Sequence, residues 1–256
     1  MLQVSEIHDQ VSEIHDAARL KSFERSLLRS HLSLTREDRP REFTLAGRNW
    51  DLFEEVFAPV YSPSTGIALE LLGLGHPQET PRSGSFLEVG CGTGVVAVMS
   101  ALAGYDRVVA ADISPSAVEN AHVNADRHGV TDRLRAVHSD LFSGLGEDER
   151  FDIIFWSSNY VMGPESYEYK SVHERAYVDT GYQTHRRFLE QSVHWTTPGG
   201  SVLLHFSDRG DLAALHEIAA DCGRELRLVA GQRVREGEYG EDMVEHMLLE
   251  IVPFGV

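Results

Sequence analysis

The chain has 256 residues, of which 42% are hydrophobic, and 40 acidic against 23 basic residues give it a formal net charge of −17. This length supports one well-buried domain with a smaller appendage, and the negative charge disfavours nucleic acid and anionic membranes as partners. No apolar run is long enough to span a bilayer, the N-terminus is charged rather than signal-like, and two cysteines disfavour a disulfide framework, so we expect a cytoplasmic protein.

The N-terminal segment contains a seven-residue repeat, VSEIHDQ at residues 4–10 followed by VSEIHDA at residues 11–17. Its valines and isoleucines share one helical stripe, which predicts a helical arm over about residues 5–31. Two heptads are too few to establish a coiled coil. The stripe therefore packs on the main domain, pairs two copies in a homodimer, or belongs to a movable lid.

From residue 85 onward, apolar β-rich runs alternate with helical patterns. The expected strands are Phe86–Val89, Arg107–Ala111, Leu134–Val137, Phe151–Trp156, Val202–Phe206, Leu226–Val229 and Met243–Ile251. This alternation indicates an α/β fold whose parallel sheet has helices on both faces, and such sheets bind ligands at the carboxyl ends of their strands. We expect a helical arm or cover at residues 1–60 and a ligand-binding catalytic domain at residues 61–256.

The first expected strand runs into a glycine-rich turn and then a helix, FLEVGCGTG at residues 86–94. The glycines permit a tight turn and a close approach of a ligand to the backbone, and the helix N-terminus offers free N–H groups. A dinucleotide fingerprint needs a glycine where Val95 stands. Glu88, two residues before the first glycine, is a further departure from the nicotinamide pattern, and it either contacts a ligand or caps the next helix.

Acidic residues end the next two expected strands. Asp112, twenty residues beyond Gly92, is placed to accept hydrogen bonds from both hydroxyls of a ribose. Asp140 is placed to accept a hydrogen bond from an adenine amino group, with Leu141 packing on the ring. Ordinary solvated strand-end acids are the alternative for both aspartates.

Together these residues resemble class I S-adenosylmethionine-dependent methyltransferases over roughly Tyr61 to the C-terminus. EVGCGTG looks like the first motif of that family, and DISPSAVENAHVNADRHGV is similar to the second motif in the branch of glutamine, ribosomal and small-molecule methyltransferases. The resemblance implies a Rossmann-like sheet of seven strands, the one containing Met243–Ile251 antiparallel. It also implies S-adenosylmethionine as cofactor and S-adenosylhomocysteine as product. Tyr61 and Thr65 are expected to close over the methionine end, although Thr65 is also a plausible helix cap.

The resemblance gives one set of candidate cofactor-binding residues. They are Tyr61, Thr65, Glu88, Gly90, Cys91, Gly92, Thr93, Gly94, Asp112, Ile113, Asp140, Leu141 and Ser157. Cys91 is interpreted as a small filler of the turn rather than a reactive thiol.

The fourth expected strand ends in FDIIFWSSNYV, residues 151–161. In the related amino-methylating branch it ends in Asn/Asp-Pro-Pro-Tyr/Phe, whose carbonyl groups accept the N–H groups of the substrate and whose ring packs on it. Here the aromatic residue is kept, both prolines are absent, and the amide stands two positions later. This departure and the negative charge disfavour a protein glutamine or a nucleic acid as substrate. Two hydroxyls and an amide still suit the orientation of a small amine or carboxylate.

Residues 162–181 form a long segment after this strand, and five of the eight tyrosines lie between Tyr160 and Tyr182. Long loops often act as lids, and aromatic side chains can enclose an organic substrate. The candidate catalytic residues are Asn159, Tyr160, Ser157, Ser158, Tyr182, Tyr177 and Ser207. Strand-end hydrogen bonding is the alternative for the two serines after the strand, and core packing is the alternative for Tyr160. The histidines show no metal-ligand spacing, so no metal is expected.

Three functions remain open. The first is a methyltransferase acting on a small amine, amino acid or related metabolite. The second is an azetidine-2-carboxylate synthase, in which the amino group of the methionine moiety attacks its own γ-carbon and methylthioadenosine is released; IFWSSNYV and GYQTHRRFLE look somewhat like that group. The third is a non-catalytic S-adenosylmethionine-binding or scaffold protein that pairs through its heptads.

Overall fold

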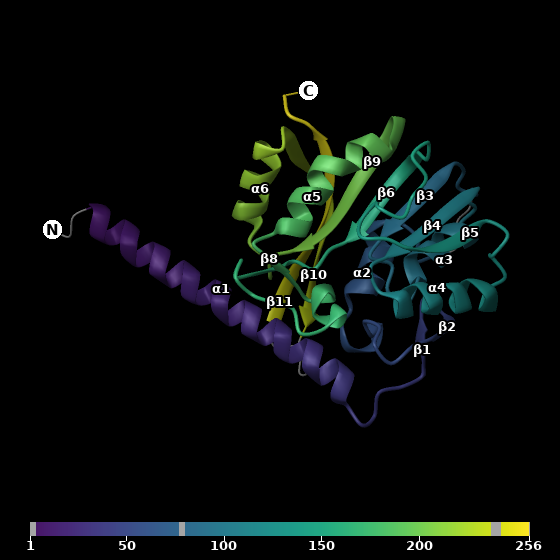
Figure 1. The fold of residues 1–256 in the computed structure, drawn as a ribbon, viewed down its shortest axis with the longest axis horizontal. Coiled ribbons are helices and arrows are strands. Elements are labelled where there is room, and N and C mark those ends of the chain that lie inside the picture. The colour runs from purple at the N-terminus through teal and green to yellow at the C-terminus, as the bar shows by residue number, and fades with distance from the viewer. Residues whose placement is uncertain (1–3, 77–79, 237–241, 256) are drawn as a thin grey trace.

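The computed structural model describes residues 4–76, 80–236 and 242–255, with side chains from residue 18 onward. A seven-stranded sheet with strand order β10-β11-β9-β6-β3-β4-β5 forms its centre (Figure 1). The strands are β3 Ser85–Val89, β4 Arg107–Asp112, β5 Leu134–His138, β6 Phe151–Ser157, β9 Thr196–Ser207, β10 Arg224–Glu236 and β11 Asp242–Pro253. β11 is antiparallel to both β9 and β10, while the other pairings in the sheet are parallel. The predicted α/β fold and its antiparallel strand are confirmed.

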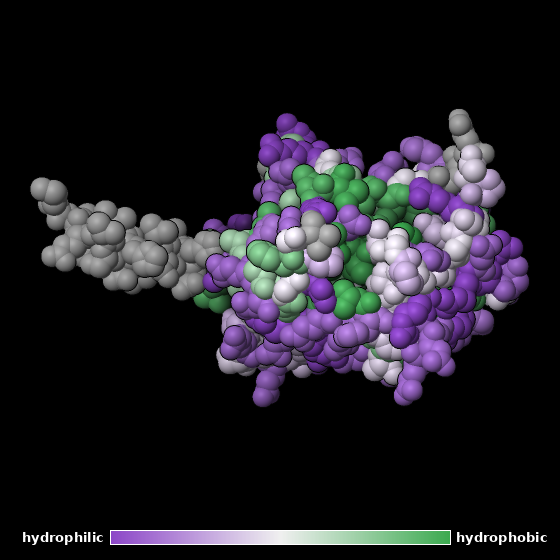
Figure 2. Space-filling view, turned by 90° about the horizontal axis from the view of Figure 1, so that it is seen from above, coloured by the Kyte–Doolittle hydropathy of each residue, from purple (hydrophilic) through white to green (hydrophobic). Residues whose placement is uncertain are grey.

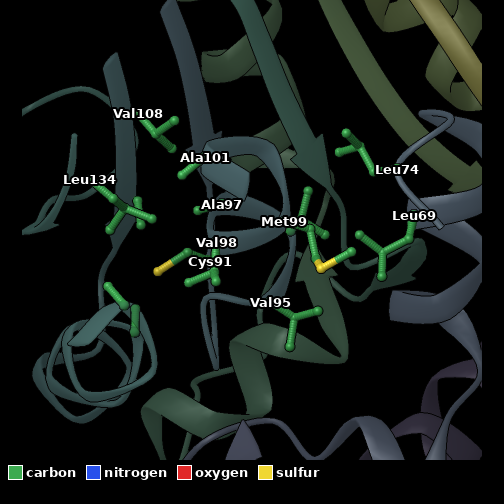
Figure 3. Packing of buried hydrophobic residues seen from close by; sticks show 14 of the residues in the cluster. Leu69, Leu74, Cys91, Val95, Ala97, Val98, Met99, Ala101, Val108 and Leu134 are labelled. Atoms are coloured by element: carbon green, nitrogen blue, oxygen red, sulfur yellow. The ribbon is translucent and has the colours of Figure 1, made fainter. Parts of the chain in front are cut away.

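Helices cover both faces of the sheet (Figure 1). They are α2 Ser64–Leu71, α3 Val95–Leu102, α4 Pro115–Arg127, α5 Gln183–Gln191 and α6 Leu212–Asp221. Residues of α2, α3 and α4 share one buried apolar cluster with the sheet, and residues of α5 and α6 share a second. In the first cluster, Met99 of α3 is directed toward Leu69 of α2 (Figure 3). Two apolar layers on one sheet explain why its strands read as nearly continuous hydrophobic runs.

A β-hairpin precedes the sheet and was not predicted. Its strands are β1 Glu42–Leu45 and β2 Arg48–Asp51. Trp50 of β2 is fully buried. Asn124 of α4 accepts a hydrogen bond from the backbone N–H of Asp51 at 2.8 Å, and Asn120 accepts one from Phe53 at 2.9 Å. These contacts tie the hairpin to the main sheet domain. The boundary between residues 60 and 61 stays a prediction.

Smaller elements lie beside the main sheet. They are the strand pair β7 Val161–Gly163 and β8 Val178–Thr180, with the 3-10 turns η1 Pro59–Tyr61, η2 Val172–Ala176 and η3 Ser192–Trp195. β7 and β8 pair in parallel, so the long segment after β6 forms a small sheet of its own beside the main one.

The predicted N-terminal helical arm is confirmed as α1, Val4–Thr35. Its second half packs on β7 and β8, where Phe23 lies in one cluster with Val161 and Val178, whereas its N-terminal part extends away from the domain (Figure 1). The side chains of the heptad stripe lie outside the described residues. Pairing of two copies through that stripe therefore stays a prediction.

The surface is largely polar. Viewed from above, hydrophilic residues cover most of the visible face and hydrophobic residues show toward its middle (Figure 2). Among the residues that the structure describes, no helix has the length and apolarity that a membrane crossing requires.

Candidate functional site

A cavity of about 1370 Å³ lies at the carboxyl ends of β3, β4 and β6, where the second half of α1 forms part of its wall. A typical site for one small ligand occupies roughly 300–1,000 Å³, so this cavity has room for two small molecules. The predicted residues that line it are Tyr61, Thr65, Glu88, Gly90, Cys91, Gly92, Thr93, Asp112, Ile113, Asp140, Leu141, Ser157, Ser158, Asn159, Tyr160 and Tyr177. The ends of separate strands meet here because the connections between them return each strand to the same edge.

Three predicted residues do not line the cavity. Gly94 has a φ of +76°, and a Cβ added there would lie 2.7 Å from the Cβ of Ala121, so this glycine allows α3 and α4 to pack closely. Tyr182 is fully buried, and its hydroxyl donates to the backbone carbonyl of Tyr160. Ser207 is also fully buried and accepts a hydrogen bond at 3.2 Å from the backbone N–H two residues further on. These three residues contribute to the packing around the cavity and not to its lining.

Asp112 connects the glycine turn to the end of β4. One carboxylate oxygen accepts a hydrogen bond from the backbone N–H of Gly92 at 2.9 Å, and the other accepts one from Ser114 at 2.8 Å. Burial raises the pKa of this carboxyl, and the two hydrogen bonds oppose that shift only in part. A Cβ added at Gly92 would meet nothing within 4 Å. The turn therefore presents open backbone to the cavity with a fixed acidic group beside it.

Glu88 is buried at the end of β3. Its side chain accepts a hydrogen bond at 2.8 Å from the backbone N–H of Ala97, in the first turn of α3, so it caps that helix while lining the cavity. Burial raises the pKa of Glu88 well above its usual value. Burial likewise raises the pKa of the Cys91 thiol, which agrees with its interpretation as a small filler.

Asp140 forms a two-pronged ion pair with Arg187 of α5, at 3.2 and 3.0 Å. This pair holds the aspartate at the rim of the cavity. The predicted contact between Asp140 and an adenine amino group stays a prediction.

Asn159 follows β6 with its side chain fixed in one orientation. Its amide nitrogen donates to the backbone carbonyls of Arg175 at 2.8 Å and Val178 at 2.7 Å, which only an N–H₂ group can satisfy. The other end, Oδ1, is buried and has no partner among the described residues. Asn159 therefore supplies the site with a hydrogen-bond acceptor.

The two residues on either side of Asn159 differ in their contacts. Ser158 donates to the backbone carbonyl of His205 at 3.1 Å, which is the strand-end hydrogen bonding considered from the sequence. The Tyr160 ring packs edge-on against the imidazoles of His205 and His246, with centroids 5.6 and 5.9 Å apart. Burial raises the pKa of the Tyr160 phenol, so it stays protonated.

Sequence reasoning missed Arg29, which lines the cavity from α1. It donates to the Ser26 hydroxyl at 2.7 Å, and within the described part of the chain no carboxylate pairs with it. Burial lowers its pKa. His205, His246 and Glu236 were also missed, although a histidine inside a predicted strand, as in VLLHF and VEHMLL, is a usable signal for a buried polar site.

Comparison with known proteins agrees with this arrangement. A family model described as a methyltransferase domain matches residues 86–177. A bifunctional methyltransferase of Rickettsia felis is 34% identical over 127 residues, covering 46% of this chain and 24% of that protein. A release factor glutamine methyltransferase of Geobacter sulfurreducens is 30% identical over 138 residues, covering 50% and 46%. The chain thus spans from about a quarter to just under half of the length of these curated relatives.

Among solved structures, a 16S rRNA methyltransferase of T. thermophilus in complex with AdoMet and guanosine superposes with a TM-score of 0.54 at 20% identity, covering 82% of this chain and 49% of that one. This match supports the fold. The sheet order, the glycine turn and the matched segment together define a methyltransferase domain over residues 86–177. In this domain and in its fold the chain resembles the class I S-adenosylmethionine-dependent methyltransferase superfamily.

The cofactor of this superfamily is S-adenosylmethionine, and the cavity fits it. Gly92 leaves the backbone open, Asp112 offers a carboxylate beside that turn, and the buried hydroxyl of Tyr61 has no partner among the described residues. These are the groups that would hold it in this chain.

Proposed function

We propose that the protein transfers the methyl group of S-adenosylmethionine to the nitrogen of a small metabolite that also carries a carboxylate. The buried, unpartnered Oδ1 of Asn159 is the observation that carries this proposal. A buried acceptor without a donor costs about 1–3 kcal/mol, and the N–H of an acceptor amine removes that cost.

When bound, the cofactor supplies an electrophilic methyl group on a sulfonium. The residues of this chain then need only position the acceptor. Asn159 accepts an N–H of the amine and thereby orients the nitrogen lone pair. The neighbouring Tyr160 ring lines the same cavity, and its face favours the positive charge that develops on nitrogen.

Arg29 supports an anionic group on the acceptor. A negative charge stabilises a half-buried guanidinium. Glu236 attracts Arg29 without direct contact, and its carboxylate is already paired with Arg209 and His246, so an anionic group on the substrate would be the direct partner of Arg29. Since Arg29 lines the same cavity as Asn159, one small molecule with an amine and a carboxylate can contact both.

Two features favour a small acceptor over the protein or RNA substrates that the names of the relatives indicate. The wall that α1 contributes, through residues such as Leu28, Arg29 and Leu32, narrows access for a folded partner. The net charge of −17 repels a phosphate backbone.

The test is a transfer assay with methyl-labelled S-adenosylmethionine. The purified protein is incubated with each of the common amino acids, with their decarboxylated amines, with a glutamine-containing peptide, or with no acceptor. Label on a small amine supports the proposal. Label on the peptide, or methylthioadenosine formed without any acceptor, replaces it by protein methylation or by cyclisation.

Variants then assign the two contacts. N159A is expected to lower kcat/KM roughly 10- to 100-fold, which corresponds to one buried hydrogen bond of about 1–3 kcal/mol, while N49A on the exposed hairpin leaves it unchanged. R29M is expected to raise KM for an amino acid and not for its decarboxylated amine. Equal effects on both acceptors would remove Arg29 from the proposal.

A further inference from the structure

A continuous chain of hydrogen bonds leads from the cavity into the sheet. Ser157 Oγ lies 2.9 Å from His205 Nδ1, His205 Nε2 lies 3.0 Å from His246 Nδ1, and His246 Nε2 lies 2.7 Å from Glu236 Oε1. The chain ends in an ion pair of 3.0 Å between Glu236 and Arg209. It crosses β6, β9, β11 and β10, which are neighbours in this order in the sheet.

The regular alternation of the strands places these side chains in one row. Phe155, Leu203 and Leu248 belong to the apolar cluster under α2 and α3. Two residues nearer the carboxyl edge, the same face carries Ser157, His205 and His246, because side chains two apart on a strand share a face. Both histidine rings are buried, with at most 1% of their surface exposed. An apolar layer is thus continued by a buried polar row, which is costly unless every member is hydrogen-bonded.

The charge on Glu236 fixes the direction of every hydrogen bond in the row. Burial raises its pKa, but the hydrogen bond from His246 and the charge of Arg209 outweigh burial and hold it below the usual value. An ionised carboxylate only accepts, so His246 Nε2 carries hydrogen and its Nδ1 accepts. His205 must then donate through Nε2 and accept at Nδ1, and the hydroxyl of Ser157 donates to it.

We propose that Ser157 is the proton acceptor for the amine substrate. His205, His246 and Glu236 are the positioning residues that turn its lone pairs toward the cavity and receive the proton. This role rests on the proposed function, because the acceptor nitrogen of that function carries the proton that is released.

The proton balance is complete within the row. The substrate nitrogen gives one proton to Ser157 Oγ, which passes its own proton to His205 Nδ1. His205 passes its Nε2 proton to His246 Nδ1, so His205 ends neutral and His246 ends as an imidazolium paired with the Glu236 carboxylate. Burial lowers the pKa of His205 to about 3, so this ring passes the proton on and does not keep it.

The charged surroundings favour this end state. The carboxylate of Glu236 faces the new cation directly. Arg209 is paired in turn with Asp242 at 3.4 Å, which offsets its positive charge. Arg29 of α1 is another charged group close to Glu236. The neutral phenol of Tyr160 hydrogen-bonds with Ser157 and Ser64, so it faces the first member of the row.

Nitrogen NMR of the histidines tests the inference without any acceptor. In uniformly ¹⁵N-labelled protein, long-range ¹H–¹⁵N correlations report which ring nitrogen carries hydrogen, with H205N and H246N used only to assign the signals. At pH 8 both His205 and His246 are expected as neutral rings with hydrogen on Nε2. A neutral His205 with hydrogen on Nδ1 would overturn the proposal.

E236Q provides the decisive perturbation. The amide has one oxygen, and the charged donor Arg209 competes for it, so the amide N–H₂ faces His246. Both rings are then expected to move their hydrogen to Nδ1, and Ser157 becomes the acceptor of its bond with His205. The matched control is E250Q on β11, whose carboxylate accepts from Ser201 at 2.8 Å away from the row, and it should leave both tautomers unchanged.

An activity measurement separates this inference from the proposed function. With an amino acid that the transfer assay identifies as acceptor, E236Q is expected to lower kcat about 100-fold, as for loss of general base catalysis. The affinity for S-adenosylmethionine, measured by calorimetry, should not change. If both histidines carry hydrogen on Nε2 in the wild type but E236Q has an unchanged kcat, the relay is refuted and the proposed function stands. If no amino acid or amine is methylated, the proposed function fails and the relay fails with it as a catalytic device, whatever the tautomers.

Discussion

Replacing Gly94 by alanine should destabilise this fold for two separable reasons. Gly94 precedes α3 with a φ of +76°, a conformation that L-residues rarely adopt. An added Cβ would also lie 2.7 Å from the Cβ and 2.8 Å from the Cα of Ala121. Since these atoms belong to the helix α4 and not to the end of a flexible side chain, one helix must move.

Two other glycines isolate the conformational part of this cost. Gly92 and Gly223 have φ of +52° and +68°, and a Cβ added to either meets nothing within 4 Å. Left-handed backbone costs alanine about 1–2 kcal/mol, and the less flexible unfolded chain returns about 0.4–1 kcal/mol. G92A and G223A should therefore lose roughly 0.5–1.5 kcal/mol. Overpacking adds about 1–3 kcal/mol at Gly94, so G94A should lose about 2–4 kcal/mol.

Urea unfolding followed by circular dichroism measures the free energy of unfolding of the wild type and all three variants. Calorimetry with S-adenosylmethionine adds a second measurement. G92A places a methyl group in the open glycine turn and should weaken binding at least roughly tenfold, whereas G223A, at the end of α6, should bind as the wild type does.

Equal stability of G94A and G223A, within about 0.5 kcal/mol, would refute the argument from close helix packing. Undiminished affinity of G92A for S-adenosylmethionine would show that the glycine turn does not approach the cofactor.

Two further predictions concern the cover and the sheet. The Arg39 guanidinium donates to the carbonyl of Ser33 in α1 at 2.7 Å and to those of Phe53 at 3.0 Å and Val56 at 2.6 Å, so it joins α1 to the segment after the hairpin. R39A should therefore cost about 2–4 kcal/mol and speed amide exchange in α1, and unchanged exchange would contradict this. The hydrogen bonds of Asp152, first from Thr197, lower the pKa of its carboxyl. Its stabilisation is therefore present above the unfolded pKa of about 4 and is lost as pH falls through the folded value. The difference in unfolding free energy between wild type and D152N should be constant at about pH 6–8 and narrow below about pH 4; a difference that widens in acid would disprove this.

Local sequence patterns were sufficient to predict the architecture and the part of the candidate site that the glycine turn and Asp112 form. Apolar runs alternating with helical periods predicted the sheet, because a parallel strand is buried on both faces and is therefore apolar at nearly every position. The glycine turn and Asp112 were recognisable because a tight turn and a strand-end acid are short-range features. The hairpin at residues 42–51 was missed because its stability comes from asparagines of α4 about 70 residues further along the chain.

Long-range packing decided the rest. Nothing local distinguishes Tyr182, which supports the site from behind, from Tyr177, which lines it. The row from Ser157 to Glu236 depends on which strands are neighbours, since its members are separated by up to 79 positions in sequence yet meet within hydrogen-bond distance. The sequence by itself therefore determined the fold and the glycine turn with its strand-end acid, where we expect the cofactor. Only the tertiary structure decided which polar side chains share one buried row, because strand order and register, not spacing along the chain, bring them together.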